Sequence, residues 1–321
     1  MHVFDAEQTR KFLPWLELIE ALRAMFRSGC EMPARHHHPL AVPGEPAGTL
    51  LLMPAWVPGE HLGVKLVSVM PGNAGRGLPA VASSYLLSDA RTGRLLALID
   101  GNELTSRRTA AASALAANLL ARADASHLLV VGTGHLAANM AAAYASVRPL
   151  RRVSFWGRRA ARAESLAERA RETLGIQAEA VADLQAAVRQ ADIVSTVTLA
   201  TEPLVRGAWL QPGCHLDLVG AFRPDMREAD DEALRRASVF VDTREGACTE
   251  GGDVVQALAS GVLRLEDICA DLFELARGQH RGRASNDEIT AFKSVGAALE
   301  DLAAARLVLA RAGVESAQRG C

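Results

Sequence analysis

Hydrophobic and polar positions follow different periods in the two parts of the chain. In residues 1–122, apolar residues recur at helical spacing over 14–28, and later apolar runs are separated by turn residues at 71–75 and 92–93. A further helix over 104–121 ends this part. The expected strands cover residues 34–40, 49–56, 63–70, 80–88 and 95–100. A few helices mixed with several strands predict an α+β domain.

The second part alternates short apolar runs with helical patterns. The expected strands cover 128–131, 152–156, 178–181, 192–198, 215–219 and 239–242, and the expected helices cover 137–147, 159–174 and 183–190. Strands that are separated by helices pair in parallel through right-handed crossovers. The predicted fold class is therefore α/β, a Rossmann-type doubly wound parallel sheet, joined to the α+β domain.

A glycine turn connects the first of these strands to its helix. The apolar strand 128–131 leads into residues 132–137, which read G-T-G-H-L-A and fit the pattern G-x-G-x-x-A. Gly132 suits a tight turn, Gly134 lets the backbone approach a pyrophosphate, and small Ala137 lets the helix pack close to the strand. Alone the motif is a weak signal, but its place between a buried strand and a helix predicts a dinucleotide site.

The end of the second strand indicates which cofactor is bound. An NAD site usually carries Asp or Glu there for the ribose 2′-hydroxyl, whereas residues 156–162 read W-G-R-R-A-A-R and contain no acid. Arg158 and Arg159, with Arg162, offer forked donors that suit a 2′-phosphate. We therefore expect NADP(H) to be preferred, with NAD(H) as the alternative. A solvated arginine cluster at a helix start is the simpler interpretation.

Composition limits the classes of function. The chain has 321 residues, 49% of them hydrophobic, and a net charge of −2, so it can bury a full core and has no basic surplus for nucleic acid. No apolar run reaches the roughly 18 residues of a membrane span, and residues 1–5 do not begin a secretion signal. We expect a cytoplasmic protein without nucleic-acid or membrane partners.

Neither the cysteines nor a histidine run predicts a cross-link or a metal site. The odd number of cysteines and the lack of C-x-x-C spacing indicate free thiols. They are Cys30, Cys214, Cys248, Cys269 and Cys321. Successive strand residues point to opposite faces, so His36, His37 and His38 do not converge on one ion, and no acid or cysteine stands beside them. We expect no metal.

Two cations of the first part lie in unusual surroundings. Only Lys11, Lys65 and Lys293 among the 35 basic residues are lysines. Lys65 interrupts an apolar strand, where a lysine is unfavourable unless it is paired or used. The alternative is a residue that protects an edge strand against pairing. Arg35 is a weaker case of the same kind.

An arginine pair begins the helix expected over 104–121. If Thr105 or Ser106 caps this helix, Arg107 and Arg108 occupy its first turn, where a cation opposes the helix dipole. This placement indicates an anionic ligand. A solvated arginine pair is the alternative.

Seven short stretches, spread over nearly the whole chain, match the motifs of a single protein family. They are 63–68 (G-V-K-L-V-S), 100–102 (D-G-N), 108–114 (R-T-A-A-A-S-A), 132–137 (the glycine turn), 197–203 (V-T-L-A-T-E-P), 250–253 (E-G-G-D) and 292–296 (F-K-S-V-G). Together they resemble the ornithine cyclodeaminase and mu-crystallin family of NAD(P)-dependent enzymes. The stretch 197–203 is most similar to the ketimine reductases of that family.

The resemblance implies a homodimer with an active-site cleft. It implies that domain 1–122, completed by 292–321, binds the substrate and forms the subunit interface, and that 123–291 is the dinucleotide-binding domain. It also implies that Arg35, Lys65 and Arg108 hold a substrate carboxylate beside the nicotinamide, which agrees with three cations forming an anion clamp. The implied cofactor contacts are Arg108, Gly132, Thr133, Gly134, His135, Leu136, Gly157, Arg158, Arg159, Thr198, Leu199, Val219 and Ser294.

Two departures from the family bear on the reaction. Its cyclodeaminases carry an aspartate after the fifth strand, where this chain has Phe222, which cannot transfer a proton. Alanines at 80 and 82 stand where family members often have hydroxyl or amide groups. Both differences favour an NAD(P)H-dependent reductase that transfers hydride to the C=N bond of a small cyclic imino acid, such as a pyrroline- or piperideine-2-carboxylate. The alternatives are an ornithine cyclodeaminase that uses NAD⁺ catalytically, an alanine dehydrogenase, and a non-catalytic binding protein.

Overall fold

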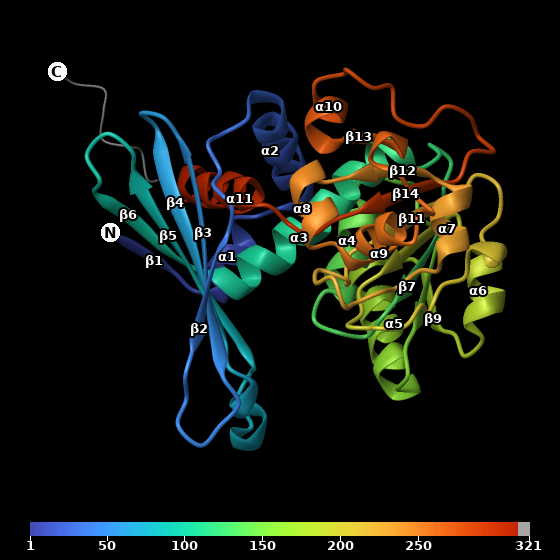
Figure 1. Cartoon of the computed structure of the whole chain (residues 1–321), viewed down its shortest axis with the longest axis horizontal. Helices are drawn as coiled ribbons and strands as arrows, with labels where there is room; N and C mark the ends of the chain where they lie inside the picture. The colour runs from blue at the N-terminus through green and yellow to red at the C-terminus, as the bar shows by residue number, and fades with distance from the viewer. Residues whose placement is uncertain (314–321) are drawn as a thin grey trace. The chain divides into compact units, whose positions relative to one another are not determined.

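The computed structural model describes residues 1–313, which form two compact units (Figure 1). Unit 1 consists of Met1–Arg108 and the chain from Ala298 onward, and unit 2 of Thr109–Ala297. We expected the division after residues 122 and 291, but more than half of helix α3 (Gly101–Leu120) clusters with unit 2. Within the described chain, no helix combines the length and apolar character that a membrane span requires.

Unit 1 contains a six-stranded sheet. Its strands are β1 (His2–Phe4), β2 (His36–Leu40), β3 (Gly48–Val57), β4 (His61–Val69), β5 (Val81–Asp89) and β6 (Leu95–Asp100), in the order β1-β6-β5-β4-β3-β2. Only β1 pairs in parallel; the other pairings are antiparallel. The strands expected from the sequence are present, but β1 and the helix α1 (Ala6–Lys11) that follows it were not expected.

Helices α2 (Trp15–Ser28) and α11 (Ala298–Arg311) build the core of unit 1. They pack against each other, and α11 also packs on β3, β4 and β5. The helical spacing predicted a buried stripe on α2, and Ile19, Leu22 and Phe26 are buried, but Leu16 of the same stripe is 61% exposed. The buried residues of α2 are Leu18, Ile19, Leu22, Met25 and Phe26.

The two faces of this sheet differ in burial. Lys65 is aligned with Met53 and Tyr85 on neighbouring strands, and all three side chains are buried. Val64 points to the opposite face, aligned with Pro54 and Leu86, and this row is only half-buried. Alternation along β4 therefore places the lysine on the buried face and leaves an apolar row on the other.

Helix α3 corrects one expectation. It begins at Gly101 rather than 104, because Asp100 caps it by accepting a hydrogen bond from the Glu103 amide at 2.8 Å. Ser106 does not cap the helix; its hydroxyl donates to a carbonyl one turn earlier. Arg107 and Arg108 consequently lie beyond the first turn, and the argument that they oppose the helix dipole is wrong.

Unit 2 contains an eight-stranded, entirely parallel sheet. Its strands are β7 (His127–Val131), β8 (Arg152–Trp156), β9 (Gln177–Ala180), β10 (Ile193–Thr196), β11 (His215–Leu218), β12 (Ser238–Val241), β13 (Ile268–Asp271) and β14 (Thr290–Lys293), in the order β13-β12-β14-β11-β10-β7-β8-β9. The crossover helices include α4 (Ala137–Ala145), α5 (Ala160–Leu174) and α6 (Leu184–Gln190). The predicted α/β, doubly wound fold is confirmed.

Several elements at the carboxyl-terminal end of unit 2 were not expected. The most important is β14, which lies between β11 and β12 in the middle of the sheet, so an expected boundary after residue 291 divides a central strand. No helical pattern was predicted directly before β14, so the predicted alternation of strands and helices did not extend to it. The others are β13, α7 (Asp231–Arg236), α8 (Arg244–Thr249), α9 (Gly252–Ala259) and α10 (Leu272–Ala276).

Candidate active site

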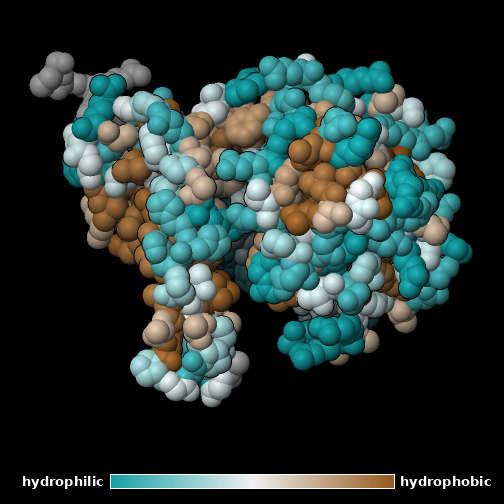
Figure 2. Space-filling view, in the orientation of Figure 1, coloured by the Kyte–Doolittle hydropathy of each residue, from teal (hydrophilic) through white to brown (hydrophobic). Residues whose placement is uncertain are grey.

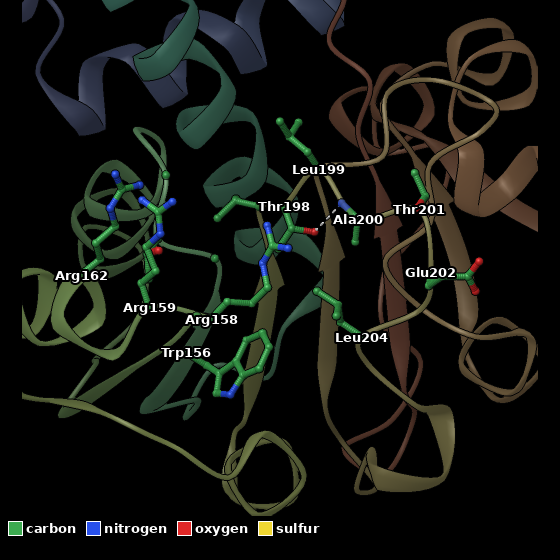
Figure 3. Close-up of a pocket in the computed structure, with 15 residues that line it drawn as sticks. Trp156, Arg158, Arg159, Arg162, Thr198, Leu199, Ala200, Thr201, Glu202 and Leu204 are labelled. Carbon is green, nitrogen blue, oxygen red and sulfur yellow. Dashed lines mark hydrogen bonds between the residues drawn. The ribbon is translucent and has the colours of Figure 1, made fainter. Parts of the chain in front are cut away.

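A pocket of about 830 Å³ lies in unit 2 at the carboxyl ends of β7, β8 and β10 (Figure 3). The connections from β7 lead outward in opposite directions along the sheet, to β8 and β9 on one side and to β10 and β11 on the other. Ligands of doubly wound sheets bind at such a reversal of strand order. The pocket is lined by Gly132, Thr133, Gly134, Trp156, Gly157, Arg158, Arg159, Arg162, Val197, Thr198, Leu199, Ala200, Thr201, Glu202 and Leu204.

The glycine turn has the geometry that its sequence predicted. Gly132 has a φ of 129°, and a Cβ atom there would lie 2.7 Å from the carbonyl oxygen of Val197, so no other residue fits without rearrangement. A Cβ atom on Gly134 would meet nothing within 4 Å, which leaves the backbone open on the pocket side. Ala137 is fully buried at the first position of α4. The turn thus combines an accessible backbone with a helix start.

Three arginines follow β8 and line the pocket. Figure 3 shows Arg159 and Arg162 at one end, Arg158 closer to Thr198, and Glu202 at the other end. All three arginines are exposed, and within residues 1–313 none of them forms a salt bridge. Their guanidinium groups are therefore available to an anionic ligand.

These features fit a nicotinamide dinucleotide. An open glycine turn at a helix N-terminus suits a pyrophosphate, and the arginines suit a further phosphate. Eight of the expected cofactor residues line the pocket: Gly132, Thr133, Gly134, Gly157, Arg158, Arg159, Thr198 and Leu199. Five others lie outside it: Arg108, His135, Leu136, Val219 and Ser294.

Two of these outlying residues end neighbouring strands. Val219 follows β11 and Ser294 follows β14, and the Ser294 amide donates to the carbonyl of Leu218 at 3.1 Å. Both side chains are buried. Together with Thr198 after β10, they occupy the carboxyl edge of three adjacent strands.

A buried cluster of charges in unit 1 contains two of the expected substrate-binding residues. Lys65 Nζ lies 2.7 Å from Asp301 Oδ2. Arg108 donates from Nε to Asp301 Oδ1 at 3.0 Å and from Nη1 to Glu300 Oε2 at 2.7 Å. Lys65 and Arg108 are 2% and 5% exposed, and both acids are fully buried. The cations converge, as the sequence analysis expected, but they converge on carboxylates of this chain.

The protonation of this cluster reflects burial and pairing. Burial lowers the pKa of Lys65 to about 8, although the Asp301 carboxylate opposes the shift. For Arg108 the burial effect is outweighed by Asp301 and Glu300, which raise its pKa. The two cations also outweigh burial at Asp301 and hold its pKa below the usual value. The ionised pairs are therefore the stable state near neutral pH.

Two further arginines of unit 1, Arg35 and Arg107, have different surroundings. Arg35 is half-buried, and its charge contributes to the lowered pKa of Lys65, so it lies in the same electrostatic environment. Arg107 instead donates twice to the carbonyl of Leu13, at 2.9 and 2.6 Å, and its guanidinium lies 3.9 Å from the Trp15 ring centre. Arg107 therefore connects α3 to the loop before α2.

Glu300 and Asp301 were not among the site residues predicted from the sequence. They lie in the first turn of α11, where carboxylates also favour the helix dipole. The signal that identifies them is an acidic pair inside an otherwise apolar helix, A-A-L-E-D-L-A-A-A over residues 297–305. Acids that are surrounded by such residues are rarely buried unless a cation meets them.

Phe222 lies in the loop after β11 and is 41% exposed. The neighbouring Arg223 pairs with Asp225 at 2.9 Å, so the nearest acid in sequence is already engaged. Leu199, in the loop after β10, is 75% exposed. The loops after β10 and β11 thus each expose an apolar side chain to solvent.

Comparisons with known proteins cover both units. Residues 5–316 match the profile of the ornithine cyclodeaminase/mu-crystallin family. The Delta(1)-pyrroline-2-carboxylate reductase of Paracoccus denitrificans is 45% identical over 293 residues, 90% of each protein, and the ketimine reductase mu-crystallin of Mus musculus is 39% identical over 295 residues, 90% of this chain and 89% of that protein. The structure of Thermococcus litoralis Delta(1)-pyrroline-2-carboxylate reductase in complex with NADH and L-proline has a TM-score of 0.91 and 35% identity, with 97% of each chain covered.

Proposed function

Because this chain belongs to the ornithine cyclodeaminase/mu-crystallin family, as its motifs predicted, we propose that it is a nicotinamide-dependent reductase of small cyclic imino acids. The reaction adds one hydride to the carbon and leaves one proton on the nitrogen of a C=N bond. The observation that carries the proposal is Phe222, an exposed apolar residue at the position where the cyclodeaminases of the family use an aspartate. The reductases named above, which are similar over about 90% of this chain, support the same activity.

The side chains of this protein would supply position and charge. Bound reduced nicotinamide supplies the hydride. We assign the pocket of unit 2 to the dinucleotide, and Lys65, Arg108 and Arg35 to the substrate carboxylate. Asp301 and Glu300 fix the orientation of two of these cations, so little rearrangement is needed when a substrate binds. A protonated cyclic imine then needs no strong base at residue 222.

For the cofactor we propose a preference for NADPH over NADH. The arginines at 158, 159 and 162 support this preference, because they line the pocket and make no salt bridge in the described chain. In addition, no Asp or Glu stands at the end of β8, where an NAD site usually carries one. A charged hydrogen bond to a 2′-phosphate contributes about 1.5–3 kcal/mol, which corresponds to a preference of at least about tenfold.

We also propose a homodimer that forms through the half-buried face of the unit 1 sheet. The row of Pro54, Val64, Leu86 and Leu98 crosses four adjacent strands on this face, and Figure 2 shows hydrophobic residues at the surface over these strands. An apolar sheet face of this kind is typical of an interaction surface. A second copy of the chain, seated on the same row by twofold symmetry, would cover it.

The test of the activity is the loss of reduced-nicotinamide absorbance when the protein is mixed with NADPH or NADH and a panel of five- and six-membered cyclic 2-imino acids. We expect turnover with at least one of them. Ammonia release from ornithine without a change in absorbance would instead identify a cyclodeaminase. Ammonia-dependent reduction of pyruvate would identify an alanine dehydrogenase, and binding without turnover would identify a binding protein.

A further inference from the structure

We propose that Glu228 is a positioning residue, which holds the loops after β10 and β11 in the shape that receives the nicotinamide end of the cofactor. The inference rests on the proposed use of a nicotinamide cofactor. Glu228 does not line the pocket and is fully buried. It acts through Thr198, which lines the pocket, and through Gly220, which follows Val219.

Four donors converge on the Glu228 carboxylate. Oε1 accepts from the backbone amide of Thr198 at 2.7 Å and from its hydroxyl at 2.8 Å. Oε2 accepts from the Gly220 amide at 2.6 Å and from the Thr196 hydroxyl at 2.8 Å. Each oxygen therefore bonds one loop amide and one hydroxyl, and a single side chain joins the ends of two neighbouring strands.

The two loops approach each other closely at the same place. A Cβ atom on Gly220 would lie 2.0 Å from the carbonyl oxygen of Thr198 and 2.5 Å from Glu228 Oε1. Any side chain at 220 therefore separates the loops or displaces the carboxylate. Glycine at 220 and the carboxylate of Glu228 are thus both needed for the close contact between the loop after β10 and the loop after β11.

A second buried carboxylate fixes Glu228 itself. Asp253 Oδ1 accepts from the amides of Glu228 and Ala229 at 2.8 and 3.0 Å, and its Oδ2 lies 3.2 Å from Lys293 Nζ. Asp253 and Lys293 are both essentially inaccessible to solvent. Within the described residues Lys293 pairs with Asp253 and Glu228 forms no salt bridge, so the charge of Glu228 rests on the four donors around it. Burial and the Asp253 charge raise the pKa of Glu228, whereas these donors and the more distant Lys293 oppose the shift.

Glutamine at 228 tests this arrangement without changing the volume of the side chain. An amide oxygen can accept two hydrogen bonds, but the amide nitrogen accepts none. Whichever carboxylate oxygen it replaces, the nitrogen faces a backbone N–H, that of Thr198 or that of Gly220. A hydroxyl can rotate away from this conflict but a backbone amide cannot, so Glu228→Gln releases one of the two loops.

Asp217 offers a matched control. It is also a fully buried carboxylate of unit 2, but its donors are only hydroxyls, from Ser113 at 3.1 Å, Tyr144 at 2.8 Å and Ser195 at 2.6 Å. None of these is a loop amide or lines the pocket. Asp217→Asn therefore perturbs a buried polar network without releasing the loops.

The experiment measures the dissociation constants of NADPH and NADH by fluorescence titration, with the thermal midpoint of each full-length variant. We expect Glu228→Gln to weaken binding of the preferred cofactor about tenfold or more, in line with the loss of a hydrogen bond to a charged group, and Asp217→Asn to change it less than about twofold. Unchanged affinity in Glu228→Gln overturns the inference. Equal weakening in both variants also overturns it, because the effect is then general destabilisation.

A milder variant covers the case in which Glu228→Gln does not fold. Thr196→Val removes one hydroxyl donor to Oε2 in a fully buried position and retains the shape of the side chain. We expect it to weaken cofactor binding about threefold while the protein stays folded; a wild-type affinity overturns the inference. Because binding is measured without turnover, a wild type that binds cofactor but reduces no imine refutes the proposed activity alone. A wild type that binds neither cofactor refutes both the proposed activity and the inference about Glu228.

Discussion

Replacement of Lys65 by methionine separates the structural role of this residue from its proposed role in substrate binding. At 2.7 Å and an effective dielectric constant of about 20, the attraction between Lys65 and Asp301 is roughly 6 kcal/mol. Desolvation of two buried charges offsets much of it. Loss of the lysine leaves Asp301 Oδ2 buried without its cation, while Oδ1 keeps Arg108.

Because Arg108 remains, we expect Lys65→Met to cost about 3 kcal/mol, the lower end of the range for removing one partner of a buried pair. For a chain of 321 residues, with an unfolding entropy of about 2.1 cal/mol/K per residue, this corresponds to a decrease of about 4–5 °C in the thermal midpoint. Methionine itself fits the apolar surroundings well, so the loss comes from the remaining carboxylate rather than from packing. The kcat/KM for a cyclic imino acid should fall by about 10²-fold or more, since the proposed electrostatic contact between Lys65 and the substrate is lost.

The double variant Lys65→Met/Asp301→Asn distinguishes the two effects. Asparagine removes the unpaired charge, so we expect the double variant to be more stable than the sum of the single changes implies, with a coupling energy of at least about 1.5 kcal/mol. Its activity should stay low, because the substrate contact is still missing. Denaturation and steady-state kinetics on all four proteins provide the measurements. Additive stabilities would refute the ion pair, and recovery of activity in the double variant would show that Lys65 serves only as the counter-ion of Asp301.

Three further predictions concern the cofactor, a buried acid and the subunit interface. Arg158→Ala should abolish most of the proposed preference for NADPH in titrations with both cofactors, and equal affinities in the wild type would contradict a phosphate-binding role. Burial raises the pKa of Asp217 from 3.8 to about 6, so its favourable contribution to stability is complete below pH 3.8 and is lost as the pH rises through 6. The thermal midpoint of the wild type relative to Asp217→Asn should accordingly be higher at pH 4.5 than at pH 7.5, and a constant difference would contradict this. If the chain forms the proposed dimer, Val64→Glu should convert it to monomers in sedimentation experiments, whereas Leu265→Glu, at an exposed apolar residue of unit 2, should not; a dimeric Val64→Glu protein would argue against the sheet face.

Local patterns predicted most of the fold. The alternating elements from residue 128 to 242 are all present, with ends that differ by two residues or fewer, because each carries its own periodicity. The start of the chain also carries a local signal for the unpredicted helix α1. Asp5 and Gln8 form a capping box at the start of α1, and an acid followed three residues later by glutamine is typical of that motif. The short strands after residue 260 carried no comparable signal.

The candidate site was only partly predictable, because its charges are balanced by residues that are distant in the sequence. The glycine turn and the arginines after β8 are local, and they line one pocket. The partners of Arg108 lie 192 and 193 residues further along the chain. An unusual cation can therefore be recognised in the sequence, but the sequence pattern does not show whether a ligand or a carboxylate of the same chain pairs with it.

Two of the three lysines lie in the two buried charge clusters described above, one around Asp301 and one around Asp253. Of the three lysines, Lys11 lies on the surface, and the other two are almost completely buried, each against a carboxylate: Lys65 against Asp301, and Lys293 against Asp253. An ammonium group is compact and donates in several directions, whereas a guanidinium is a broad planar fork. At both buried positions the ammonium group meets a single carboxylate oxygen, at 2.7 Å from Asp301 and 3.2 Å from Asp253. Arginine at either position would have to displace that acid, and with it the helix or loops that the acid orients.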